Sequence, residues 1–270
     1  MTDTLDAIYI YDAPEAIGLN IGVVAQYLAD LVPEAEVESR TDFFTYHLGK
    51  FEESQVNVLT EQIVARLDER EVSNLVHPDL RDGTEPVTPE ERDLGVVYLG
   101  ERLQEVMRPV LSQEERTERH LHIVCISQCI GHFEAGAPLL VLQTIQHGQP
   151  TIISTTGLVE APELPREYTF RRAQLLALGV DEGVEELDEK FAGATLHHGD
   201  SRITRVAVGH ALHALFRRLF GEQGCDVPTC PLHRARTHDA LYEAHLSAES
   251  GLCDRHTRML IEWREAGRKV

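Results

Sequence analysis

Three cysteines and one histidine near the end of the chain have the spacing of a metal site. Cys225 and Cys230 are separated by four residues, and after 22 further residues Cys253 and His256 form a Cys-x2-His pair. Two close pairs joined by a longer segment are typical of a tetrahedral zinc site, because each turn aims two ligands at one ion. We therefore predict a structural zinc ion held by three thiolates and one imidazole.

Two alternatives to this ligand set remain open. His233 forms a second Cys-x2-His pair with Cys230, so it could replace one of the four ligands. The cysteines could also be buried small apolar side chains without any metal. Cys125 and Cys129 lie far from this pattern. Five cysteines are too few to staple 270 residues, which favours a reducing cytoplasm over a disulfide framework.

His210 and His213 are the second group that could do chemistry. They are three residues apart on an expected helix, so they share one face and could hold a catalytic metal. A zinc peptidase helix usually carries His-Glu-x-x-His, in which the glutamate is the general base. In this chain Ala211 and Ala214 occupy the positions of the glutamate and of the second histidine.

The motif is therefore incomplete, and we favour two packed, hydrogen-bonded histidines over a catalytic pair. If the chain hydrolyses peptides, the base must come from elsewhere in the sequence. Glu160 and Glu167, which follow the middle strand of the chain, are the candidates.

Alternating and continuous apolar runs predict an α/β protein around these residues. We expect strands over 7–11, near 37, and over 96–99, 121–127 and 149–154, with a small polar turn over 154–157. Helical spacing of apolar residues predicts helices over 17–31, 59–67, 103–107, 206–220, 238–247 and 254–268, and an exposed loop over 77–93. We divide the chain into an α/β body over 1–201 and a helical C-terminal module over 202–270. One continuous domain is the alternative.

The excess of acidic residues indicates a protein adapted to high salt. There are 45 acidic and 25 basic residues, giving a formal charge of -20, and only three of the basic residues are lysine. Such a surface is typical of proteins that work at high salt, although a GC-rich genome also replaces lysine by arginine. Residues 202–270 differ, since they carry 11 basic and 8 acidic residues. The apolar run over 137–142 is too short to cross a membrane, and the acidic residues 1–30 are unlike a signal peptide.

The C-terminal motifs resemble a known family. The layout of archaemetzincins resembles three features of this chain: the segment 205–213, the Cys-x4-Cys pair and the later Cys-x2-His pair. A second resemblance, to an uncharacterised archaeal metallopeptidase family, rests on the segments 150–162 and 165–168. The resemblance implies a metzincin-like fold with a mixed central sheet, flanking helices and a zinc-binding C-terminal region. It also implies an archaeal, specifically haloarchaeal, origin and a cytoplasmic location. Two positions depart from the archaemetzincin pattern: His256 stands for a cysteine, and Gly224 for the third histidine.

Three functions follow from these observations. The first is a zinc metallopeptidase with an altered catalytic site, acting on a peptide or protein. The second is a non-enzymatic, zinc-stabilised binding protein. The third is a nucleic-acid-binding module, for which arginines surround the expected zinc site: Arg217, Arg218, Arg234, Arg236, Arg255 and Arg258. We rank the third lowest, because molar salt removes most of the affinity gained by releasing counterions.

Overall fold

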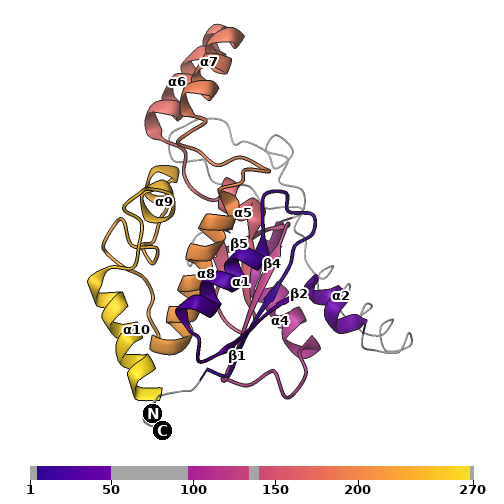
Figure 1. The fold of residues 1–270 in the computed structure, drawn as a ribbon. Helices are drawn as coiled ribbons and strands as arrows, with labels where there is room; N and C mark the ends of the chain where they lie inside the picture. The colour runs from indigo at the N-terminus through magenta and orange to yellow at the C-terminus, as the bar shows by residue number, and fades with distance from the viewer. Residues whose placement is uncertain (1–4, 50–96, 134–139, 268–270) are drawn as a thin grey trace.

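A mixed five-stranded sheet forms the centre of the molecule (Figure 1). The computed structural model describes residues 5–49, 97–133 and 140–267; the helix predicted over 59–67 and the loop over 77–93 lie outside them. The strand order is β2 (Glu36–Arg40), β1 (Ala7–Tyr11), β4 (His120–Ile126), β8 (Thr151–Ser154) and β7 (Ile145–Gln146). The first four strands are parallel, and β7 is antiparallel to β8.

Both faces of this sheet are covered by helices, because its strands are apolar on both sides. In β1, Ile8 and Ile10 face one core, whereas Tyr11 faces the other. The first core is covered by α1 (Ile21–Leu31) and α8 (Ile203–Phe220), and the second by α2 (Phe43–Leu48), α4 (Gly100–Met107) and the short 3₁₀ helix η2 (Arg108–Val110).

A smaller sheet lies beside the main one. It has the order β3 (Val97–Leu99), β5 (Cys129–Phe133) and β6 (Leu140–Gln143), with β5 parallel to β3 and antiparallel to β6. Helix α5 (Thr155–Glu160) follows β8 directly, so the polar turn predicted there is wrong. The side chain of Ser154 accepts a hydrogen bond from the Gly157 amide and thereby caps the helix.

The remaining helices lie outside the two sheets. Figure 1 shows α6 (Arg166–Leu178) and α7 (Asp181–Phe191) together as a hairpin that projects from the body. Helices α9 (His238–His245) and α10 (Asp254–Gly267) lie on the outer side of α8 (Figure 1). The fold class predicted from the sequence, α/β with a mixed sheet and flanking helices, is confirmed.

One apolar core contains residues from both parts of the chain. It includes Ile8 and Ile123 of the sheet, Leu215 of α8 and Leu260 of α10. Helix α8 thus packs directly on strands of the preceding part of the chain. The domain boundary at residue 201 stays a prediction. None of the helices in the described ranges combines the length and the apolar character needed to cross a bilayer.

Candidate metal centre and histidine pocket

Cys225, Cys230, Cys253 and His256 converge in the C-terminal region. Their sulfur and ring-nitrogen atoms all lie within 4.8 Å of one another. The sulfur atoms of Cys225 and Cys253 are 3.8 Å apart, and Nδ1 of His256 lies 3.1 Å from Sγ of Cys253. Two thiolates that bind one zinc ion at ~2.3 Å in a tetrahedron are about 3.8 Å apart. The spacing fits one tetrahedral ion, and the four residues are those that the sequence pattern selected.

A tight loop positions the first pair of cysteines. The amide of Cys225 donates to the carbonyl of Leu232 at 2.8 Å, and the amide of His233 donates to the carbonyl of Cys230 at 2.8 Å. Gly224, just before the loop, has φ of 153°, and a Cβ there would lie 2.7 Å from Nε of Arg234. The loop therefore brings both thiols to the same side with few residues.

The start of α10 positions the second pair. Cys253 immediately precedes the helix, and His256 lies in its first turn, with its side chain fully buried. Behind the ring, Oε2 of Glu222 is 3.6 Å from Nε2 of His256, and Arg255 forms an ion pair with the same carboxylate. A carboxylate in this place favours a proton on Nε2 and leaves Nδ1 free to bind a metal.

The thiols of the cluster differ in their ionisation. Burial raises the pKa of Cys225 to about 12 and also raises the pKa of Cys230, because a buried thiolate loses its hydration. Burial opposes ionisation of Cys253 as well, but N–H groups from the first turn of α10 bring its pKa below the ordinary value. A divalent cation stabilises all three thiolates, because thiols that bind a metal are deprotonated outright.

His233, the alternative ligand, is not one of these four residues. Its Nδ1–H donates to the carbonyl of Cys225 at 2.9 Å. Its ring lines a second site, a cavity of about 250 Å³ between α8, α9 and the segment after β6.

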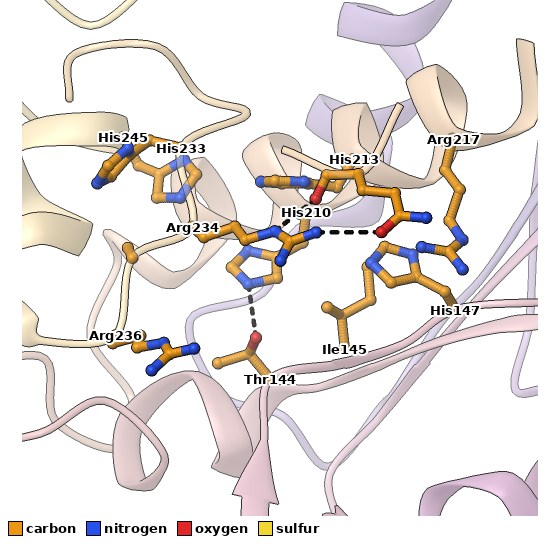
Figure 2. Close-up of a pocket in the computed structure, with 12 residues that line it drawn as sticks. Thr144, Ile145, His147, His210, His213, Arg217, His233, Arg234, Arg236 and His245 are labelled. Atoms are coloured by element: carbon orange, nitrogen blue, oxygen red, sulfur yellow. Dashed lines mark hydrogen bonds between the residues drawn. The ribbon is translucent and has the colours of Figure 1, made fainter. Parts of the chain in front are cut away.

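Five histidines line this cavity, and we call it the histidine pocket (Figure 2). Two of them, His210 and His213, come from α8; His245 ends α9, His147 follows β7, and His233 comes from the cysteine loop. Thr144, Ile145, Gln223, Ala235 and three arginines complete the lining. The pair predicted from the sequence therefore belongs to a larger cluster.

Four of the pocket histidines, His147, His210, His213 and His245, have a pKa well below the ordinary value and are neutral at pH 7. Burial lowers the pKa of His210 to about 4 and that of His147 to about 4, and lowers that of His213 to about 3. The pKa of His245 also lies well below its ordinary value, for the same reason. Neutral imidazole is the form that binds a metal ion.

Two ring nitrogens in the pocket have no hydrogen-bond partner in the described part of the protein: Nδ1 of His147 and Nδ1 of His245. His210 is held on both sides, because its Nδ1–H donates to the carbonyl of Val206 at 3.0 Å and its Nε2 accepts from the hydroxyl of Thr144 at 2.9 Å. Buried polar atoms without a partner are unfavourable, and a bound ligand would satisfy them.

The spacing of the rings is close to that of metal ligands. The ring centre of His210 is 5.5 Å from that of His245 and 6.1 Å from that of His213, which is 6.4 Å from His147. Three imidazoles on one zinc ion have ring centres about 5 Å apart, given Zn–N distances of ~2.0 Å. Among the described residues, only the Cys3His cluster has ligand atoms that all lie within 4.8 Å of one another, so binding one zinc ion in the pocket would require these rings to move.

Gly209 lets His245 reach the pocket. A Cβ at position 209 would lie 2.0 Å from Nδ1 and 2.3 Å from Cε1 of His245, so a side chain cannot share this space with the ring. Helix α8 thus carries a glycine in its interior, where alanine is favoured by roughly 1 kcal/mol. The close approach of α9 explains this choice.

The two candidate bases lie elsewhere. Glu160 ends α5, and its carboxylate is 3.0 Å from Nε2 of His198. Glu167 lies on the projecting helix α6 and pairs with Arg171 and Lys190. Neither lines the histidine pocket, and no carboxylate is found among its described lining residues.

The six C-terminal arginines do not form one surface. Arg218 pairs with Glu118, and Arg255 pairs with Glu222. Arg217, Arg234 and Arg236 instead line the histidine pocket. The six arginines therefore do not all surround the zinc site as expected, and the sequence contains no sign that His147 and His245 are neighbours of His210. Their spacing in the sequence does not predict this, because α9 and the segment at His147 come near α8 only in the folded protein.

One comparison with known proteins identifies a family for this chain. The family model described as "Probable metallopeptidase family (DUF6775)" matches residues 4–263. The crystal structure of archaemetzincin from Methanopyrus kandleri aligns with a TM-score of 0.45 and 11% sequence identity, covering 97% of each chain. No curated protein matches the sequence.

Proposed function

The chain belongs to the probable metallopeptidase family DUF6775, and on that premise we propose that it is a zinc-dependent peptidase with two metal sites. The Cys3His cluster holds a structural zinc ion, and the histidine pocket is the reaction site. The observation that carries the first site is the convergence of four ligand atoms within 4.8 Å. The observation that carries the second is five histidines around one cavity.

The structural zinc ties the end of the chain to the core. Cys230 and His256 are fully buried, and the segment between the two ligand pairs includes α9, which carries His245 into the pocket. Zinc binding to such a cluster is coupled to folding. Loss of this ion would therefore also disturb the pocket.

The second zinc ion of this proposal lies in the histidine pocket. His210, His213 and His245 would hold it, with His147 as a further ligand, because these imidazoles are neutral and two of their buried nitrogens have no other partner in the described residues. When bound, zinc supplies Lewis-acid activation of a peptide carbonyl and of water.

The side chains of the pocket prepare this chemistry. Val206 fixes which nitrogen of His210 carries its proton, since its carbonyl accepts from Nδ1–H. In the same way the carbonyl of Cys225 holds the proton of His233 on Nδ1, which leaves Nε2 as a proton acceptor in the pocket. His233 is therefore the described lining residue best placed to act as general base.

A non-enzymatic binding protein is the second candidate. The observation that favours it is the lack of a carboxylate among the described lining residues, since zinc peptidases generally use a glutamate as base. In this alternative the fold keeps its structural zinc, and the pocket binds a ligand without reaction.

Metal analysis of the purified protein separates the two candidates. The peptidase proposal predicts two zinc ions per chain; Cys230→Ser removes at least one, and His210→Ala removes one while the thiolate-bound ion stays. Peptide hydrolysis should disappear in His210→Ala and His233→Gln. A single zinc ion in the wild type, unchanged in His210→Ala, would refute the second site and support the non-enzymatic candidate.

A further inference from the structure

Arginines form the rim of the histidine pocket. Arg217, Arg234 and Arg236 line the cavity and are exposed, whereas His210 and His245 at its floor are buried. Figure 2 shows Arg234 over the centre of the site, with Arg217 and Arg236 on opposite sides. A ligand in the cavity therefore lies near three guanidinium groups.

The positive charge of this rim is not neutralised by neighbours. None of the three arginines forms an ion pair with a carboxylate of the described residues, although the protein as a whole has a formal charge of -20. Three other C-terminal arginines show the contrast, since Arg218, Arg255 and Arg264 pair with glutamates. A concave site lined by one sign of charge concentrates the field and attracts anions.

Arg234 is held in position before any ligand binds. Its Nε donates to the carbonyl of Gln223 at 2.6 Å, and its Nη2 lies 3.4 Å from the Gln223 side-chain oxygen. The side chain packs over Gly224, where a Cβ would displace it. The guanidinium is thus oriented by neutral partners, so its charge remains available to a ligand.

We infer that the arginine rim binds a carboxylate group of a peptide while the adjoining residue enters the histidine pocket. This inference rests on the proposed function, which places the substrate in the pocket. Planar guanidinium groups match carboxylates in bidentate hydrogen bonds. The cavity of about 250 Å³ is smaller than the ~300–1,000 Å³ of pockets that enclose a drug-sized ligand, so only the end of a peptide fits.

Nucleic acid is a poorer match for the same charge. Channels for single-stranded nucleic acid combine basic groups with aromatic side chains on which the bases stack. The pocket lining contains no phenylalanine, tyrosine or tryptophan among the described residues. A carboxylate needs no such platform.

Binding of short peptides to the zinc-loaded full chain tests the inference. Isothermal titration calorimetry would compare an N-acetylated tri-alanine with a free C-terminal carboxylate and the same peptide as its C-terminal amide. A third peptide, amidated but ending in glutamate, offers only a side-chain carboxylate. We expect at least one of the two acids to bind about tenfold or more tightly than the neutral amide, because charge-assisted hydrogen bonds are worth ~1.5–3 kcal/mol.

Variants identify the groups responsible. Arg217→Gln and Arg236→Gln should each weaken binding of the preferred acid by about tenfold and leave binding of the neutral amide unchanged. Arg258→Gln removes the same charge from an exposed position on α10 that does not line the pocket, and it is the matched control. Its affinity for the acid should equal that of the wild type.

The result also identifies the source of the carboxylate. Preference for the free-acid alanine peptide means recognition of the C-terminus, and preference for the amidated glutamate peptide means recognition of an acidic side chain; both support the inference. Equal affinity for all three peptides, an equal loss in Arg258→Gln, or tighter binding of a single-stranded oligonucleotide would overturn it. Metal stoichiometry is measured separately, so a protein that prefers acids but holds one zinc ion would refute only the peptidase proposal.

Discussion

Replacing Gly209 by alanine tests whether α9 and α8 meet as closely as the pocket requires. In the middle of a helix this change alone should stabilise the protein by about 1 kcal/mol. The added methyl group, however, would lie 2.0 Å from Nδ1 of His245, whose side chain is only 3% exposed. The imidazole must move, and overpacking of this kind typically costs about 1–3 kcal/mol.

The expected net effect of Gly209→Ala is thus a loss of about 0–2 kcal/mol. The same change in a His245→Ala background meets no ring and should stabilise the protein by about 1 kcal/mol. The two changes are therefore coupled by about 1–3 kcal/mol, which a double-mutant cycle measures directly. Gly209→Ala should also release the pocket zinc and retain the ion held by the cysteines.

Urea unfolding of the four proteins, each with zinc at the cysteines and none in the pocket, provides the free energies. The analysis of the residual metal provides the second readout. Stabilisation by about 1 kcal/mol in both backgrounds, with no coupling, would show that His245 does not lie against Gly209, and the account of the pocket would fail.

Three further predictions concern the rest of the molecule. His122 is fully buried, and burial lowers its pKa to about 4 in the folded protein. The unfolded chain therefore binds a proton at His122 at higher pH than the folded protein does, and the free energy of unfolding should fall by about 3 kcal/mol between pH 6.5 and 4. In His122→Gln, acid unfolding should lack this part of the pH dependence. Arg202→Met removes the arginine that pairs with the buried Asp200 and should lower the free energy of unfolding by about 2 kcal/mol. This is less than the ~3–5 kcal/mol expected for a fully buried pair, because the Arg202 side chain is 29% exposed. An unchanged midpoint of urea unfolding would contradict this. The formal charge of -20 predicts that molar KCl raises the melting temperature in calorimetry, and a decrease would count against the halophilic interpretation.

The central elements could be predicted from the sequence because their residues are patterned for burial. Ile8, Ile10 and Tyr11 form a short β-rich run that ends at Asp12, and this run is β1. The hairpin of α6 and α7 could not be found in this way. Helix α6 buries no residue, so its sequence lacks the apolar face that makes a helix visible.

The two candidate sites differ in the same respect. The ligands of the Cys3His cluster lie in two close pairs, so their spacing alone indicated one ion. The histidine pocket joins His147, His210 and His245 from three separate elements, which only tertiary packing brings together. One local feature pointed to this contact, namely the glycine at position 209 inside a long helix. The reason for a glycine at this position is visible only in the folded protein, where the ring of His245 lies against Gly209.

X-ray absorption at the zinc edge, on wild-type protein and on Cys230→Ser, tests whether the Cys3His cluster binds zinc. We expect sulfur neighbours at ~2.3 Å in the wild type, and a reduced zinc–sulfur signal with a lower zinc content in the variant. Zinc with nitrogen and oxygen neighbours only, or a zinc–sulfur signal unchanged by Cys230→Ser, would contradict it.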